Sequence, residues 1–237
     1  MEIKAIKTSI FKEKESLEGF IKKHVKKLRE GDILVVTSKI VSLAEGRIKT
    51  FESEKERDEC IKSESELALR PSKRWFTICA GMLTTIAGID ESNAGGKSIL
   101  LPKNSFATAG KILKFLKKSY GVKKVGVIVV DSRSIVMRRG IVGEAIGYTG
   151  FKGLGDERGK KDLFGRKIKY ARANVADSLA GASVLLMGES NQGTPLAIVS
   201  GAPVQFVSRV KKDELLVPLA EDKFTPFWKE VVKRKLI

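Results

Sequence analysis

Apolar residues recur along the chain with two periods, one typical of helices and one typical of buried strands. A period of about 3.6 residues predicts amphipathic helices from Leu17 to Arg29 and from Ser105 to Gly121. Small apolar residues from Asn174 to Met187 predict a third, closely packed helix. Ile33–Val36 and Val125–Val130 are continuous apolar runs, which predicts strands covered on both faces.

The remaining segments carry weaker signals. Residues 51–70 are highly charged and are expected to be helical, whereas Phe76–Ile89 mixes apolar residues with Thr and Gly as one or two strands do. Pro195–Ser200 predicts another strand, and Thr225 followed by a proline predicts the start of a last helix. Glycines crowd the stretch from Gly140 to Gly165, a density expected of a mobile loop or of close backbone approach to a ligand.

The order of these elements favours one fold class. Predicted strands and helices do not alternate regularly, so an α+β fold is expected rather than a doubly wound sheet. The 237 residues show no internal repeat and no linker, which predicts a single domain over residues 1–237. A hydrophobic content of 42% is enough for a core without disulfide or metal cross-links.

Composition also narrows the compartment and the chemistry. No apolar run approaches the roughly 18–20 residues of a membrane span, and the charged N-terminus lacks a secretory apolar region, so a cytoplasmic protein with no membrane partner is expected. Cys60 and Cys79 stand far apart and predict neither a disulfide nor a thiolate zinc site. His24 is the only histidine, which disfavours His-dependent triads and leaves oxygen ligands for any metal.

The chain is strongly basic. Lys and Arg number 45 against 28 Asp and Glu, which gives a formal net charge of +17 that attracts polyanions. Aromatic residues are only 7% of the chain, and no nucleic-acid-binding module is present, so nucleic acid is not the favoured partner. Many of the lysines fall on the polar faces of the predicted helices, where a solvated surface is the simpler interpretation.

Three carboxylates lie where apolar segments give way to turns rich in Gly, Ser and Asn: Asp90, Asp131 and Glu189. Together with the hydroxyl of Ser132 they offer the hard oxygen ligands that suit Mg²⁺ or Mn²⁺ bridging phosphates. Spacing alone leaves the alternative open that each is an ordinary turn or cap residue.

Two segments resemble phosphate-binding motifs, but each lacks a required feature. Gly95–Ser98 ends like a GxxxxGK[ST] loop, but Glu91 stands where the first glycine is required. Gly153–Gly155 is not preceded by a predicted strand, so a Rossmann fold is disfavoured as well. The amide-rich segments Thr37–Lys39 and Gly188–Thr194 remain as candidates for binding a nucleotide.

Six blocks of sequence, in order and in register, closely resemble the coenzyme F-420-0:L-glutamate ligase family. They are GDILVVTSKIVSLAEGRI (31–48), AGIDESN (87–93), VGVIVVDS (125–132), RRGIVGEAIG (138–147), KDLFGR (161–166) and LLMGESNQGTP (185–195). The resemblance implies a mixed-sheet α+β fold, unrelated to P-loop and Rossmann proteins, that forms an intertwined homodimer and could comprise two intertwined subdomains.

The resemblance also implies an activity. Members of the family use GTP to phosphorylate an acceptor carboxylate, and the amine of L-glutamate then displaces phosphate from the acyl phosphate to form an amide. Two divalent ions, Mg²⁺ or Mn²⁺, are expected, with no catalytic side chain beyond metal-assisted positioning. The most similar function is that of a coenzyme F-420-0:L-glutamate ligase.

The matching motifs assign residues to these roles. Metal ligands fall on Asp90, Asp131, Ser132 and Glu189, with Ser132 in place of the family's threonine. Nucleotide contacts fall on Ser38, Lys39, Asn93, Met187, Gly188, Ser190, Asn191, Gln192, Gly193 and Thr194, and more loosely on Thr8 to Phe11. Among the basic residues near these loops, Arg139, Lys161 and Arg166 are candidates for contacts with phosphate or substrate carboxylates, with solvated surface as the alternative.

Departures from the family pattern leave alternatives open. Leu43 stands where the family commonly has a lysine, and this difference bears on the choice of GTP over ATP. The segment from Arg47 to Trp75 is also short, and the match is poor after Pro203. The acceptor is therefore F-420-0 or another polyanion such as a folate or pterin, and the preferred metal and the number of glutamates added stay open. A hypothesis of another class is a basic nucleotide- or nucleic-acid-binding relative without catalysis.

Overall fold

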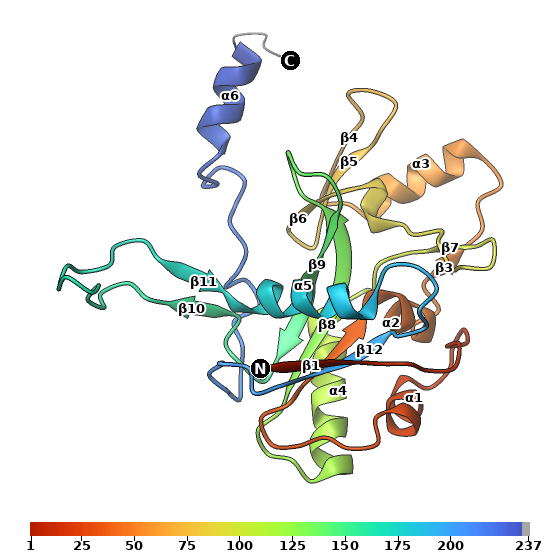
Figure 1. Cartoon of the computed structure of the whole chain (residues 1–237). Helices are drawn as coiled ribbons and strands as arrows, with labels where there is room; N and C mark the ends of the chain where they lie inside the picture. The colour runs from red at the N-terminus through yellow and green to blue at the C-terminus, as the bar shows by residue number, and fades with distance from the viewer. Residues whose placement is uncertain (234–237) are drawn as a thin grey trace.

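The fold is built on a five-stranded mixed sheet (Figure 1). The computed structural model describes residues 1–233, apart from the side chains of Trp228, Val231 and Val232. The strand order is β1-β12-β2-β8-β9, in which only β2 and β8 pair in parallel. The strands are β1 (Glu2–Ile6), β2 (Ile33–Thr37), β8 (Gly126–Ser134), β9 (Ile141–Thr149) and β12 (Leu196–Ser200). The predicted α+β class is confirmed, and β1 is a strand that the sequence analysis did not identify.

Alternating residues of the central strands feed two separate cores. In β2, Leu34 and Val36 pack with α1, α2 and α4, whereas Ile33 and Val35 pack with α5 on the other face. All four side chains are fully buried because successive residues of a strand point to opposite faces. The result is a sheet sandwiched between helices. These helices are α1 (Leu17–His24), α2 (Ser38–Ala44), α4 (Ser105–Tyr120) and α5 (Val175–Met187).

Capping residues explain most of the helix boundaries. Asn104 accepts a hydrogen bond from Ala107 N at the start of α4, and Gly121 ends that helix with a φ of 68°. Two predictions were wrong in extent. The helix expected to continue to Arg29 ends at His24, because Val25 adopts an extended conformation. The polar residues Thr37–Lys39, which follow the predicted strand and were expected to form a loop or turn, contain the start of α2.

A smaller layer of short elements lies beside the end of the sheet where β2 and β8 terminate (Figure 1). It consists of β3 (Ile48–Lys49), α3 (Glu54–Ser63), β4 (Leu67–Leu69), β5 (Phe76–Cys79), β6 (Met82–Thr85), a 3₁₀ turn (Ile86–Gly88) and β7 (Ser98–Ile99). Its own core contains Trp75 and the two free, buried cysteines. The helix expected over residues 51–70 is therefore only ten residues long, and a strand follows it.

Two segments project from this body. The hairpin of β10 (Leu154–Asp156) and β11 (Arg172–Asn174) extends to one side, and α6 (Thr225–Lys233) stands above the sheet (Figure 1). The predicted start of the last helix at Thr225 is confirmed. At the hairpin tip Leu163 and Phe164 are 99% and 88% exposed. Among residues 1–233, no helix is both long enough and apolar enough to cross a lipid bilayer.

The glycine-rich stretch from Gly140 to Gly165 is not simply a ligand loop, which corrects the sequence-based expectation. It contains β9, and two of its glycines let helices approach the strand. A Cβ at Gly143 would lie 2.4 Å from Val184 Cγ2 of α5, and one at Gly147 would lie 2.5 Å from the carbonyl carbon of Ser105 in α4. Here glycine permits close packing between layers.

We predict opposite effects of two Gly→Ala changes, one at the α4–β9 contact and one at an open position of α4. Gly147→Ala places a methyl group against backbone atoms that cannot move independently, so the free energy of unfolding should fall by about 2–3 kcal/mol. Gly110→Ala, within α4, meets no atom within 4 Å and should raise it by roughly 0.5–1 kcal/mol. Urea denaturation measures both, and equal effects of the two substitutions would contradict the packing argument.

Candidate active site

The candidate site forms where the two parallel strands end at the same edge of the sheet. Thr37 of β2 is in register with Val130 of β8, so Ser38 and Asp131 follow side by side. Ser38 Oγ donates a hydrogen bond of 2.5 Å to Asp131 Oδ1. On the next residue, Ser132 Oγ donates to Glu189 Oε2 at 3.0 Å. Segments distant in sequence are thereby joined within one site.

The third carboxylate enters from the loop that precedes β7. Asp90 Oδ2 forms an ion pair of 2.7 Å with Lys39 Nζ, at the start of α2. Lys39 Nζ also donates to the carbonyl and the hydroxyl of Ser92, at 2.7 and 3.0 Å. Burial acts to raise the pKa of Asp90, but Lys39 and the hydrogen bonds from Ser92 outweigh it and hold that pKa below its usual range.

Asp131 has the most perturbed acidity of the three carboxyl groups. Burial raises its pKa to about 6, and repulsion from Asp90 and Glu189 adds to the effect, against the hydrogen bond from Ser38 and the charge of Lys39. The three carboxylates converge through adjacent residues, because Ser38 and Lys39 contact Asp131 and Asp90, and Ser132, next to Asp131, contacts Glu189. Asp131 does not lie at the end of a strand, as the sequence suggested, because β8 continues to Ser134.

The loop after α5 closes the site from the other side. Asn93 Nδ2 donates to the carbonyl of Ser190 at 3.0 Å, which ties the loop of Asp90 to that of Glu189. Within the second loop Ser190 N donates to Gln192 Oε1 at 2.8 Å, and Gly188 and Gly193 have positive φ. Its ends are held by a hydrogen bond from Thr194 Oγ1 to Met187 O, and Asn191 is exposed at its centre.

The segment from Thr8 to Phe11 borders the same loop. Thr8 N donates to Gly193 O at 2.9 Å, and Ser9 N donates to His24 Nε2 at 3.1 Å. The single histidine therefore anchors the backbone beside the site. The predicted nucleotide residues thus surround the carboxylates, although their role as nucleotide contacts stays a prediction.

Comparison with known proteins identifies the family. A family model described as F420-0:gamma-glutamyl ligase matches residues 5–201. The chain belongs to this family. The coenzyme F420:L-glutamate ligase of Methanococcus maripaludis strain C6 is 35% identical over 221 residues, which cover 83% of this chain and 86% of the relative. The protein of the same name from Methanocaldococcus jannaschii shows the same identity and coverage. That of Archaeoglobus fulgidus is 34% identical and covers 82% and 85% of the two chains.

The donor chemistry of the cluster fits a hard divalent cation, but the side chains are engaged with one another. Within the described residues, no group of three or more His, Cys, Asp or Glu is arranged to hold a metal ion. Lys39, Ser38 and Ser132 instead occupy the carboxylates of Asp90, Asp131 and Glu189. All of these ligands are oxygens, and an ion among them would remove the repulsion that raises the pKa of Asp131.

The predicted basic contacts lie elsewhere in the chain. Arg139 is exposed in the turn between β8 and β9. Lys161 and Arg166 are exposed on the β10–β11 hairpin, which projects away from the body (Figure 1). Within residues 1–233 of one chain, none of the three contacts the carboxylate cluster, so their role in binding substrate stays a prediction.

Sequence reasoning missed an ion pair next to Asp131. Glu144 of β9 is the register partner of Asp131, and Arg133, two residues along β8, forms an ion pair with Glu144. Arg133 Nη1 also donates to Leu83 O of β6 at 2.7 Å, which joins the sheet to the smaller layer. Arg133 and Asp131 share one face of β8, because residues two apart point the same way. That periodicity would have indicated their proximity, had the strand been extended past Val130.

Replacing Asp131 should stabilise the metal-free protein. Because its pKa is higher in the folded chain than in the unfolded chain, the native state binds more protons and loses stability as pH rises from about 4 to about 6. Asp131→Asn removes this loss and retains an acceptor for Ser38, so with a chelator present its free energy of unfolding should exceed that of the wild type by up to about 3 kcal/mol at pH 7.5.

Urea denaturation at about pH 4 and about pH 7.5 measures this difference, since at the lower pH both proteins carry an uncharged group at position 131 in the native state. Asp213→Asn, which changes an exposed aspartate of the C-terminal stretch, is the matched control. Equal stability of Asp131→Asn and wild type at both pH values would contradict the desolvation of Asp131.

Proposed function

We propose that this protein is a ligase that joins the amine of L-glutamate to a carboxylate of F420-0 through an amide bond. Membership of the F420-0:gamma-glutamyl ligase family and the names of the relatives support the substrate pair. The observation that carries the proposal is the convergence of Asp90, Asp131 and Glu189 between two loops rich in backbone amides. With cations bound to these carboxylates, such a site would bring together a nucleotide phosphate and the acceptor carboxylate, which are both negatively charged.

We propose that GTP activates the acceptor. A carboxylate oxygen of F420-0 attacks the γ-phosphorus of GTP, the bond to the β-phosphate oxygen breaks, and GDP leaves. The amine nitrogen of L-glutamate, after losing one proton of its ammonium group, attacks the carbonyl carbon of the acyl phosphate. Inorganic phosphate leaves, and the nitrogen releases a second proton to give the neutral amide. The acceptor carboxylate and the γ-phosphate both carry negative charge, so their approach requires cationic neutralisation.

The chain provides that neutralisation in two ways. Lys39 lies beside Asp90 and is the nearest cation to the cluster. We propose that Asp90, Asp131, Ser132 and Glu189 hold Mg²⁺ or Mn²⁺, which when bound shields phosphate and carboxylate charges. The loop from Met187 to Thr194, together with Ser38 and Asn93, would position the nucleotide through amides and short polar side chains.

Leu43 supports the assignment of Lys39 as the phosphate cation. The Leu43 side chain is partly buried against the core between α2, α4 and the sheet. Ser38 and Lys39, one helical turn earlier in α2, are the residues of that helix that contact the carboxylates. Leu43 replaces the lysine that the family commonly has at this position. Lys39 is therefore the residue of α2 that would supply positive charge to the site.

The assembly is proposed to be a homodimer. The exposed Leu163 and Phe164 at the tip of the β10–β11 hairpin are typical of a protein–protein interface rather than of a free surface. In that arrangement Lys161 and Arg166, next to the tip, would lie near the partner.

Incubation with GTP, Mg²⁺ or Mn²⁺, L-glutamate and F420-0 should increase the acceptor mass by one or more glutamyl residues, with release of GDP and phosphate. Tetrahydrofolate in a parallel reaction tests the alternative acceptor, and ATP tests the nucleotide. A mass increase on folate alone would move the reaction to another substrate. Intact GTP with both acceptors would favour a basic binding protein without catalysis.

Asp131→Asn and Glu189→Gln should each lower kcat by about 100-fold or more, because both remove charge from the site where phosphoryl transfer is stabilised. Circular dichroism and the urea midpoint check that both variants fold. Asp213→Asn, on the exposed C-terminal stretch, is expected to retain wild-type kcat. Wild-type turnover by Asp131→Asn would exclude this carboxylate from the proposed machinery.

A further inference from the structure

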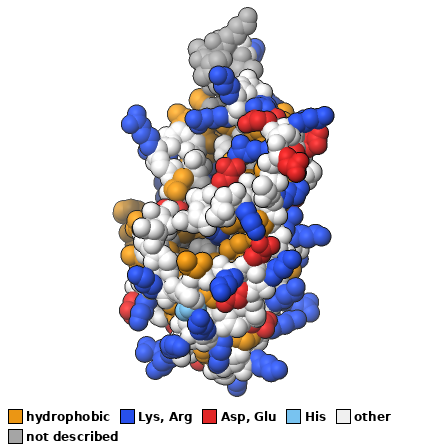
Figure 2. All heavy atoms as spheres, turned by 90° about the vertical axis from the view of Figure 1, so that its right-hand side faces the viewer, with side chains coloured by type: hydrophobic (Ala, Val, Ile, Leu, Met, Phe, Trp, Pro, Cys, Tyr) orange, Lys and Arg blue, Asp and Glu red, His pale blue; other side chains and the backbone are white. Residues whose placement is uncertain are grey.

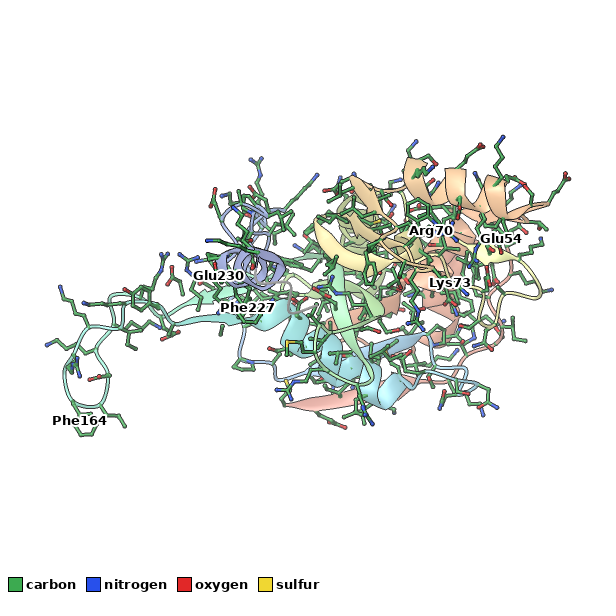
Figure 3. The ribbon with its side chains drawn as sticks, turned by 90° about the horizontal axis from the view of Figure 1, so that it is seen from above. Glu54, Arg70, Lys73, Phe164, Phe227 and Glu230 are labelled. Atoms are coloured by element: carbon green, nitrogen blue, oxygen red, sulfur yellow. The ribbon has the colours of Figure 1, made fainter. Side chains whose placement is uncertain are left out.

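A polar cavity lies on the side of the Asp90 loop that faces away from the carboxylate cluster. Its volume is about 460 Å³, within the roughly 300–1,000 Å³ typical of small-ligand sites. The walls are the segment between β3 and α3, the first turns of α3, and the far side of the loop from residue 90 to residue 98. Figure 3 labels Glu54 at the start of α3, on this wall. The proposed function so far assigns no ligand to this cavity.

One loop separates the cavity from the carboxylate cluster. Asp90 and Ile99 form an antiparallel bridge, so the backbone is extended there and successive side chains point to opposite sides. Asp90 faces Lys39 and the cluster. Glu91 faces the cavity, where its Oε1 lies 3.1 Å from Arg57 Nη2 and accepts a hydrogen bond of 3.3 Å from Ser98 Oγ. A ligand held by Glu91 would therefore lie behind this loop, with the loop backbone between the ligand and the side chain of Asp90.

The cavity walls carry both signs of charge. Arg57 and Lys97 supply two cations, and Glu52, Glu54 and Glu91 supply three carboxylates. A nucleoside triphosphate or a polyanionic acceptor would meet three like charges in this space. A small ligand with one ammonium group and two carboxylates would find partners of both signs. The charge pattern therefore favours a dicarboxylic amino acid.

We propose that this cavity binds L-glutamate, the amine donor. The inference rests on the proposed function and adds the location of one substrate. Arg57 and Lys97 receive the two carboxylates, and Glu91 receives the ammonium group on the side of the cavity that adjoins Asp90. The cavity would thereby hold the donor behind the loop of Asp90, and the amine would reach an activated acceptor carbonyl only when the ligand or the loop moves.

The two cations have donors to spare. Among the described residues, the Arg57 guanidinium pairs only with Glu91, although its planar fork carries five N–H donors. Lys97 Nζ forms one ion pair, of 3.0 Å, with Glu13, and that pair is half-exposed. An exposed pair of this kind contributes little to stability, so Lys97 can turn to a ligand carboxylate at small cost.

The wall of the cavity is held in place without the ligand. Ser53 Oγ accepts from Glu56 N at 3.2 Å, and Glu56 Oε2 accepts from Glu52 N at 2.9 Å, which fixes the start of α3 in a reciprocal cap. On the opposite wall, Gly95 and Gly96 have positive φ, and a Cβ at either would meet no atom within 4 Å. The backbone there is open to a ligand.

Arg57→Met and Lys97→Met test the assignment by steady-state kinetics with varied L-glutamate and saturating GTP and F420-0. Each should raise the KM for L-glutamate about tenfold or more, because a charge-assisted hydrogen bond is lost. The KM values for GTP and F420-0 should stay within twofold of wild type. Lys55→Met removes the same charge from the same helix outside the cavity, and it should change none of these values.

Isothermal titration with L-glutamate alone separates this inference from the proposed function. Binding to wild type that weakens at least tenfold in Arg57→Met supports the site whether or not F420-0 is the acceptor. If wild type ligates glutamate but both variants keep its KM, the cavity is not the donor site. A rise in the KM for F420-0 instead would assign the cavity to the acceptor and overturn the inference. Lys97→Met, on the surface, carries the test if Arg57→Met does not fold.

Discussion

The parallel pairing of β2 and β8 is the constraint on which the candidate site depends. In a parallel pair both chains run toward the same edge, and here the pairing ends at Thr37 and Val130, so Ser38 and Lys39 follow on one chain and Asp131 and Ser132 on the other. The antiparallel neighbours β12 and β9 run the opposite way and bring different chain ends to that edge. The loop of Glu189 lies between α5 and β12, and the start of β12 pairs with the end of β2, so this loop lies at the same edge.

This geometry has an electrostatic cost that the fold tolerates. Burial of Asp131 raises its pKa, and the nearby carboxylates of Asp90 and Glu189 add to this effect, which opposes folding at neutral pH. Hydroxyl groups and Lys39 compensate only in part. A buried carboxylate with carboxylate neighbours is typical of a site that binds a cation, because the cation converts an unfavourable interaction into a favourable one. The positive surface also attracts anionic ligands such as phosphates, since Lys and Arg side chains are spread over the face shown in Figure 2.

Sequence periodicity predicted the elements that make the core and failed where tertiary contacts decide the structure. The apolar runs of β2 and β8 and the capped helices α4 and α5 were predictable, because burial and capping are local signals. The start of α2 was not, since Ser38 and Lys39 are polar residues whose partners, Asp131 and Asp90, lie far along the chain. The glycines of β9 suggested a loop because their reason is the approach of α4 and α5, which no local pattern encodes.

The candidate site shows the same division between local and distant information. Each of its carboxylates stood out by position after an apolar segment, but their convergence followed only from six sequence blocks occurring together and then from the fold. The adjoining cavity left no comparable signal. Arg57 and Glu91 belong to segments whose charges look like ordinary solvated surface, and they meet only because β3 and β7 pair and bring α3 against the loop of Asp90. A loop with alternating side chains would therefore serve two ligands under our proposals, because Asp90 faces the proposed phosphate site and Glu91 faces the cavity proposed for the amine donor.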